Sequence, residues 1–205
     1  MQRKRAQVRR VEILSATVKQ IQSRGMAALR ISDVASSLGV SPALVVYHFE
    51  TKENLLAEAL RHAAERDLLK LRRIMRSSGS ATERLMAALH WYAPTGRARG
   101  WIVWVDGWAA AMWDKTIAQV LTDLQQQWTD AIAELIEEGV RDGAFTVADA
   151  HDAASRITAL LDGLAVRTIV HGGRLKRDAL SGWLVQQAAW ELGTTDSDLA
   201  TTMTS

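Results

Sequence analysis

The segment ISDVASSLGVSPALVVYHFETK, residues 31–52, decides how the rest of the chain is interpreted. Val34 and Leu38 lie four residues apart, so they share one face of a first short helix. Gly39 follows and supplies the backbone freedom that ends a helix abruptly. The pattern predicts a short helix that stops at a tight turn.

A second short helix is expected directly after this turn. Ser41 places a hydroxyl at the N-cap, and Pro42 occupies a first-turn position where its missing N–H does no harm. Val45 and Phe49, again four residues apart, would pack back onto the first helix. Two such helices form a helix-turn-helix, whose second helix fits the DNA major groove. Ordinary helical packing is the alternative, because many helical bundles contain such a hairpin. The outward-facing residues would be Pro42, Ala43, Leu44, Tyr47 and His48.

The distribution of charge favours a nucleic-acid partner. The net charge of the 205-residue chain is only +2, yet residues 1–76 contain fifteen Lys and Arg against seven Asp and Glu. Residues 77–205 contain ten basic side chains against sixteen acidic ones. The end that carries the helix-turn-helix would therefore attract polyphosphate. Arg3, Lys4 and Arg5 are expected to form a flexible arm that follows phosphates or enters a minor groove.

Composition indicates an all-α, cytosolic protein that is not an enzyme. Only two prolines occur, and alternating β-branched runs are absent from the sequence. The lack of cysteine excludes disulfides and thiolate chemistry. The basic N-terminus is not followed by the apolar stretch of a signal peptide, and the longest apolar run, 101–113, is too short to span a bilayer. We find no catalytic, metal-binding or cofactor motif, and the five histidines are scattered.

Residues 7–60 resemble the DNA-binding domain of the TetR family of ligand-responsive bacterial repressors. The resemblance implies that the helix from Pro42 to His48 enters the major groove. It further implies that residues 41–44, which begin with Ser41, contact base edges, and that Tyr47, His48 and Lys52 contact phosphates. The residues that carry the resemblance are Ile13, Leu14, Ala16, Gly25, Val34, Ala35, Gly39, Val40, Ser41, Phe49, Lys52, Glu53, Leu55 and Leu56.

Two departures from the family pattern bear on the operator sequence. Val46 stands where the family frequently has a tyrosine, and Arg30 replaces the Ser or Thr that usually opens the first hairpin helix. We expect Ser32 to cap a slightly shorter helix and Arg30 to reach a phosphate or a guanine. Ala43 and Leu44 suit a thymine methyl group better than hydrogen-bonded readout.

The remainder of the chain is expected to form about nine helices with the first domain included. We assign residues 1–51 to the DNA-binding domain, 52–193 to a helical ligand-binding and dimerisation domain, and 194–205 to a disordered polar tail. A Ser/Gly-rich break at residues 77–80 interrupts the helical pattern between the two halves.

Tryptophans gather in the segment GWIVWVDGWAAAMWD, residues 100–114. An aromatic stripe at helical spacing is often core, yet so many flat rigid rings pack poorly without a cavity. Ligand pockets are mostly apolar with a few polar groups, and such a site would suit a flat hydrophobic or cationic effector. The resemblance places the inducer in this part of the chain. The candidate ligand-binding residues are His90, Trp91, Trp101, Trp104, Asp106, Trp108, Met112 and Trp128.

The last two long apolar helices, residues 147–170 and 177–192, need a partner surface. Burial within the same subunit is one possibility, and the resemblance implies a homodimer held by these helices. The candidate dimerisation residues are Ile157, Leu160, Leu161, Leu164, Leu180, Trp183, Leu184 and Gln187. Asp162 lies in this apolar stretch and needs a partner if buried; Arg167 and an interface hydroxyl are the alternatives.

Taken together, the sequence predicts a homodimeric repressor of double-stranded, pseudo-palindromic operator DNA. A small effector would release it by tilting the helix at residues 52–76 and changing the spacing of the two DNA-binding heads. The alternative is a helical sensor or enzyme that uses the tryptophan-lined cavity without regulating DNA.

Overall fold

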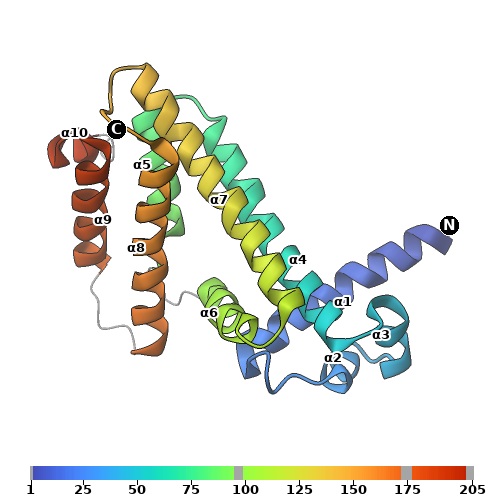
Figure 1. Cartoon of the computed structure of the whole chain (residues 1–205). Helices are drawn as coiled ribbons and strands as arrows, with labels where there is room; N and C mark the ends of the chain where they lie inside the picture. Colours follow the sequence, from blue (N-terminus) through green and yellow to red (C-terminus); the bar gives the residue numbers. More distant parts are fainter. Residues whose placement is uncertain (1, 95–98, 172–176, 202–205) are drawn as a thin grey trace. The chain divides into compact units, whose positions relative to one another are not determined.

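The computed structural model describes residues 2–94, 99–171 and 177–201, which form ten α-helices and no strand (Figure 1). The predicted all-α class is confirmed, with one helix more than expected. That helix, α10 (Asp196–Thr201), lies in the segment predicted to be disordered. Thr195 Oγ1 accepts a hydrogen bond from the Asp198 backbone N–H at 3.2 Å, and Leu199 is fully buried. A cap and one apolar anchor therefore order a polar segment. Within the described residues no helix has the length and apolar character needed to cross a bilayer.

The chain folds into two compact units. Unit 1 consists of residues 1–67 and 99–124, and unit 2 of residues 68–98 and 125–205. Helices α4 (Lys52–Met75) and α7 (Lys115–Arg141) contribute residues to both units. These packing units divide the chain differently from the expected boundary at residue 51, because α6 (Arg99–Ala111) belongs with the helix-turn-helix.

Unit 1 is built around a small apolar core beneath the helix-turn-helix. Helix α1 (Gln2–Arg24) packs against α2 (Ile31–Ser37), which in turn packs against α3 (Pro42–Phe49), and the side chains of Val34 and Val45 are fully buried. Residues 2–5 are part of α1, so the prediction of a flexible arm was wrong. Neither Gly nor Pro occurs before Gly25 to interrupt the helix.

Helix α6 packs closely against the rest of unit 1 at Gly107. A Cβ added to Gly107 would lie 3.2 Å from Leu60 Cδ2 and 3.5 Å from Leu121 Cδ1. The α6 backbone therefore approaches α4 and α7 more closely than a larger residue would comfortably allow. This close packing explains why a segment distant in sequence shares the core of the DNA-binding unit.

Unit 2 is a helical bundle with a larger core. It contains α5 (Ala81–Tyr92), α8 (Ala150–Val170), α9 (Arg177–Leu192), α10 and the C-terminal parts of α4 and α7. Helices α8 and α9 lie side by side (Figure 1). The side chains at the centre of this core are Leu71, Leu85, Leu89, Ile132, Ile136, Ile157, Leu161, Leu184 and Leu192.

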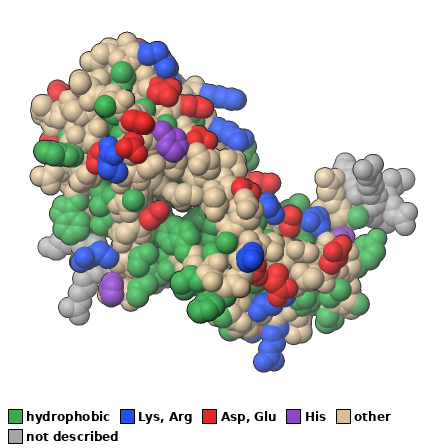
Figure 2. All heavy atoms as spheres, viewed as in Figure 1, with side chains coloured by type: hydrophobic (Ala, Val, Ile, Leu, Met, Phe, Trp, Pro, Cys, Tyr) green, Lys and Arg blue, Asp and Glu red, His purple; other side chains and the backbone are tan. Residues whose placement is uncertain are grey.

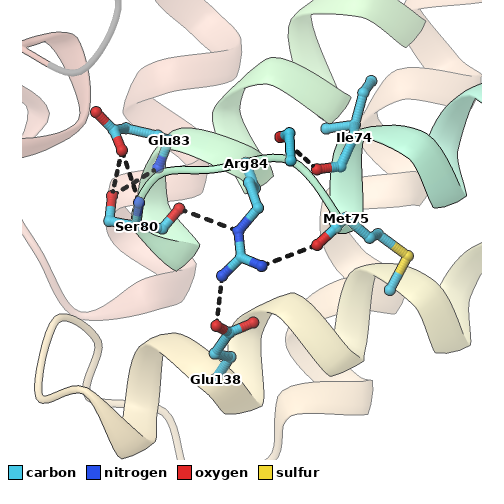
Figure 3. A network of polar contacts seen from close by, with 7 residues as sticks. Ile74, Met75, Ser80, Glu83, Arg84 and Glu138 are labelled. Carbon is cyan, nitrogen blue, oxygen red and sulfur yellow. Dashed lines mark hydrogen bonds and ion pairs between the residues drawn. The ribbon is translucent and has the colours of Figure 1, made fainter.

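A polar network closes the break between α4 and α5 (Figure 3). Ser80 Oγ accepts the Glu83 backbone N–H at 3.2 Å, and Glu83 Oε2 accepts the Ser80 N–H at 2.6 Å, which together form a capping box. Arg84 donates to the Met75 carbonyl at 2.8 Å and pairs with Glu138 of α7. The Ser/Gly-rich break is thus an ordered junction inside unit 2.

Candidate DNA interface and effector-binding region

The helix-turn-helix is fixed by local caps. The Arg30 backbone N–H donates to Asp33 Oδ2 at 3.1 Å, and Ser41 Oγ accepts the Leu44 N–H at 3.3 Å. Gly39 has a φ of +65°, as the tight turn requires. Helix α2 begins at Ile31, so the expectation that Ser32 caps a shorter helix was wrong. Asp33 serves the α2 N-terminus from the third helical position.

Helix α3 presents a largely apolar outer face. Pro42 and Ala43 are exposed, and Tyr47 has 79% of its surface accessible. Val46 was not among the residues predicted to contact DNA, yet its side chain is 42% exposed. Its position four residues after Pro42 was the signal that could have found it. Leu44 and His48 are only partly exposed.

Not all of the basic side chains predicted to contact DNA are free to do so. Lys52 Nζ donates to the Ala27 carbonyl at 3.2 Å, which ties the start of α4 to the loop before α2. Arg30 and Ser32 are exposed next to the start of α2. The side chains of Arg3, Lys4 and Arg5 lie outside the described residues.

Arg10 of α1 anchors the C-terminal end of α3, a role that the sequence did not reveal. Its guanidinium donates to the His48 carbonyl at 2.6 Å and lies 4.4 Å from the centre of the Phe49 ring. It also approaches Glu58 of α4 at 3.4 Å. One arginine therefore satisfies a helix-end carbonyl, covers an aromatic ring and joins three helices. The 38-residue separation from His48 left no local signal for this contact.

The predicted ligand-binding residues fall into two groups. Unit 1 holds the α6 residues, where Trp101 and Trp108 have ring centres 6.3 Å apart. Met112 is 71% exposed. Unit 2 holds Trp91 and Trp128, whose ring centres lie 6.2 Å apart.

The two polar groups predicted for the pocket already have protein partners. Asp106 Oδ2 accepts the Met26 backbone N–H at 2.5 Å, so this carboxylate holds the segment after α1. His90 Nδ1 lies 2.8 Å from the Met86 carbonyl, which can only accept, and we therefore assign the ring proton to Nδ1. Nε2 then accepts from Ser181 Oγ at 2.9 Å. Both side chains support the fold in the described structure.

Unit 2 contains an aromatic cluster formed by Trp91, Tyr92 and Trp128. Tyr92 stacks on Trp128 at 3.8 Å between ring centres, and Trp91 lies 5.8 Å from Tyr92. Lys70 Nζ stands 4.6 Å from the centre of the Trp91 ring. Lys70 and Tyr92 are not among the ligand-binding residues predicted from the sequence. Trp128 Nε1 is buried and has no hydrogen-bond partner within the described part of the chain.

Most of the predicted dimerisation residues face the core of their own unit. Leu160 and Gln187 are partly exposed, and Trp183 is 44% exposed. Trp190, which was not predicted, has 81% of its surface accessible. Apolar periodicity identified the buried face of each helix, and so these side chains cannot form an outer contact surface. The buried residues are Ile157, Leu161, Leu164, Leu180 and Leu184.

Asp162 is a largely buried carboxyl group on α8. Burial raises the pKa of its carboxyl group from 3.8 to about 7. Neither Arg167 nor any other described residue is recorded as an ion-pair or hydrogen-bond partner. The folded protein therefore favours the protonated acid across a pH range in which an exposed aspartate is ionised.

A capped helix-turn-helix with an exposed second helix, joined to a separate helical unit, defines a helix-turn-helix DNA-binding protein. Residues 13–59 match the family model for bacterial regulatory proteins of the tetR family. Residues 81–193 match the model for the C-terminal domain of BetI-type transcriptional repressors. The chain belongs to the TetR family, with a C-terminal domain of the BetI type. It is a DNA-binding transcriptional regulator and not an enzyme.

Relatives support this assignment along nearly the whole chain. The HTH-type transcriptional regulator BetI of Burkholderia thailandensis is 26% identical over 183 residues, covering 82% of this chain and 85% of that protein. A transcriptional regulator from Saccharomonospora viridis, solved in complex with choline, is 31% identical with a TM-score of 0.79, covering 87% of this chain and 94% of that one. A TetR-family regulator from Rhodococcus sp. is 26% identical with a TM-score of 0.77, covering 90% and 98%.

Replacing Arg10 should weaken operator binding. The variant Arg10→Met leaves the His48 carbonyl without its donor and the Phe49 ring without its cation, so the α3 C-terminus loses its anchor. We expect DNA affinity to fall about tenfold, which corresponds to about 1.4 kcal/mol. Fluorescence anisotropy with a duplex footprinted upstream of the protein's own gene measures the effect.

Arg61→Met is the matched control for this experiment. Arg61 contacts the same Glu58 at 3.6 Å but lies on α4 and is not recorded as a partner of α3. It should therefore retain DNA affinity. Equal affinities for the two variants would show that Arg10 does not position α3.

Asp162→Asn should stabilise the protein at alkaline pH. The folded-state pKa of about 7 lies above the ordinary value of 3.8, so the parent loses stability as pH rises from about 4 to 7. The neutral amide has no such cost, and we expect the variant to exceed the parent by about 4 kcal/mol at pH 8 and by little at pH 4. Urea unfolding across this range measures the difference. The exposed Asp152 provides the control Asp152→Asn, and a pH-independent gain at position 162 would contradict the burial argument.

Proposed function

We propose that this regulator is a repressor that leaves its operator when a small organic cation, such as a quaternary ammonium compound, binds to unit 2. The observation that carries the proposal is the aromatic cluster of Trp91, Tyr92 and Trp128. Lys70 already places a positive charge 4.6 Å from the Trp91 ring centre. This contact supports the idea that the Trp91 face attracts cations.

The chemistry of a quaternary ammonium ion suits this cluster. Such an ion cannot donate hydrogen bonds, so aromatic faces and the exclusion of water provide its recognition. The buried Trp128 indole N–H, unpaired among the described residues, is available to donate to a hydroxyl group of the ligand. The choline complex of the Saccharomonospora viridis regulator, at 31% identity, supports the same ligand class.

On the DNA side, we propose that α3 lies in the major groove with Tyr47 and Val46 toward the duplex. The exposed face is mostly apolar, so thymine methyl groups are its best-matched base contacts. Few polar groups on this face can read bases, and phosphate contacts with DNA shape would supply much of the affinity. Arg30 is the exposed cation nearest in sequence to the turn.

Operator binding would require two copies of the chain. One short recognition helix contributes little affinity, whereas two related by a twofold axis engage half-sites roughly 34–36 Å apart. We place the contact on the outer face of α9, where Trp183, Gln187 and Trp190 share one helical stripe. Two large exposed tryptophans on one stripe are costly in water and favour a partner. Figure 2 shows that apolar side chains also reach the surface elsewhere on the visible face.

Helix α4 provides the route by which the effector would act on DNA. The same helix carries Lys70 in unit 2 and Glu58, the partner of Arg10, in unit 1. A cation that displaces Lys70 from Trp91 would shift α4 and with it the support of α3. An allosteric coupling of about 1–3 kcal/mol changes DNA affinity about 5–150-fold, enough to release an operator.

Choline should reduce operator affinity through its charge. Its neutral carbon isostere, 3,3-dimethylbutan-1-ol, has nearly the same shape and should have little effect because it lacks the cation–π attraction. Lys70→Gln removes the competing ammonium group and should lower the choline concentration needed for release about threefold. Anisotropy of the protein–operator complex measures each midpoint, and Arg73→Gln, an exposed α4 cation, is the control. Equal potency of the alcohol and choline would refute a cation site.

Charges placed on the α9 stripe should separate the subunits. We expect Trp183→Glu combined with Trp190→Glu to yield a monomer in sedimentation experiments and to lower operator affinity at least about 100-fold. Trp113→Glu, at a position 88% exposed on unit 1, should remain dimeric and serves as control. A double variant that sediments like the parent would place the dimer contact elsewhere.

A further inference from the structure

A pocket lies within unit 1. It has a volume of about 350 Å³, at the small end of the range for small-molecule sites. Three helices form its walls: α1, α4 and α6. The residues that matter for its chemistry are Ser15, Lys19, His62, Arg66, Val103 and Trp104.

One wall of this pocket is flat and apolar. Trp104 is partly exposed toward solvent, and Val103 beside it on α6 is buried. Val18 of α1 and Ala63 of α4 continue the apolar lining. A half-covered indole between small aliphatic side chains offers a face on which a planar ring can stack.

The rim of the pocket is positively charged. Lys19 of α1 and Arg66 of α4 are exposed, and the described structure records no ion pair for either side chain. Asp67 also lines the pocket, but it already has an interaction partner in the protein. Arg66 offers a planar fork of donors that matches a carboxylate, and Lys19 adds a second mobile charge.

The inner wall adds a pair of polar side chains. His62 Nε2 and Ser15 Oγ lie 3.0 Å apart and connect α4 to α1. His62 Nδ1 is 3.9 Å from Glu65 Oε2, whose side chain is 72% exposed. The pair can hydrogen-bond a polar substituent without adding negative charge to the pocket.

We propose that this pocket is a second effector site, for small aromatic carboxylates. The ring would stack on Trp104, and the carboxylate would lie between Arg66 and Lys19. The sequence placed Trp104 in a site for a flat hydrophobic or cationic effector; its surroundings in unit 1 supply cations and therefore favour an anion. The site does not depend on the choline-type site, because the two sets of residues belong to different units.

A ligand bound in this pocket would stabilise the packing of α1 and α4, the two helices that hold the recognition helix α3 in place. Helix α1 carries Arg10 and α4 carries Glu58, and both helices line the pocket. A ligand that contacts α1, α4 and α6 together binds only the assembled unit. Such binding stabilises that unit against local opening.

The test uses the full-length protein and two matched probes, 1-naphthoate and its neutral isostere 1-naphthamide. Calorimetric titration should show tighter binding of the carboxylate to the parent protein. Lys19→Gln combined with Arg66→Gln should weaken 1-naphthoate binding about tenfold and leave 1-naphthamide unchanged, because only the charged partner is lost. Both side chains are exposed, and circular dichroism confirms that the helices of the variant persist.

Two further variants complete the experiment. Lys115→Gln removes an exposed cation of unit 1 that does not line the pocket, and it should bind 1-naphthoate like the parent. Trp104→Leu should weaken both probes about fivefold through loss of stacking. Lys70→Gln, which alters the choline response, should leave 1-naphthoate binding intact. Equal binding of the two probes to the parent, or an equal loss in Lys115→Gln and the double variant, would overturn the proposal.

Discussion

An eight-residue helix such as α3 is too short to be stable in water on its own, because isolated helices below about 12–15 residues are marginal. Its outer face must also remain exposed if it is to meet DNA, so tertiary packing can use only one side. Three contacts solve this problem: Ser41 caps the start, Phe49 is buried beneath the end, and Arg10 donates to the His48 carbonyl. The remaining architecture of unit 1 follows from the need to hold these three contacts.

Arg10 can anchor α3 only if α1 itself is held in place. The far end of α1 is held by Asp106, which accepts the Met26 backbone N–H across 80 residues of sequence. Gly107, the next residue, allows α6 to lie close to Leu60 of α4. A helix that the sequence assigned to ligand binding is thus a structural part of the DNA-binding unit. A displacement of α6 or α4 would therefore be transmitted to α3 through α1, which Asp106 of α6 and Glu58 of α4 both contact or support and whose Arg10 binds the His48 carbonyl.

Local signals predicted much of the fold, and long-range contacts escaped prediction. The N-cap of α3 and its buried Val45 follow from residues a few positions apart, so the sequence alone was sufficient. Periodicity marks an apolar face but does not identify its partner: Val8 and Val11 lie at helical spacing on α1, and they are 54% and 48% exposed. The same limitation misassigned the buried leucines of α8 and α9. Side-chain pairs such as Arg10 with His48 or Tyr92 with Trp128 depend on how helices pack, which a single sequence does not encode locally.

The charged side chains beside each tryptophan determine which ligands the tryptophans can bind. A tryptophan face attracts a cation, whether that cation comes from the protein or from a ligand. Beside Trp91 the protein supplies one ammonium group, Lys70, which a ligand cation of similar charge can replace. Beside Trp104 the protein supplies two cations at the rim, so an incoming cation would be repelled and an anion attracted. Aromatic residues alone therefore do not determine the class of ligand. The number and mobility of neighbouring charges decide it, and these can be assigned only after the helices have been placed within each unit.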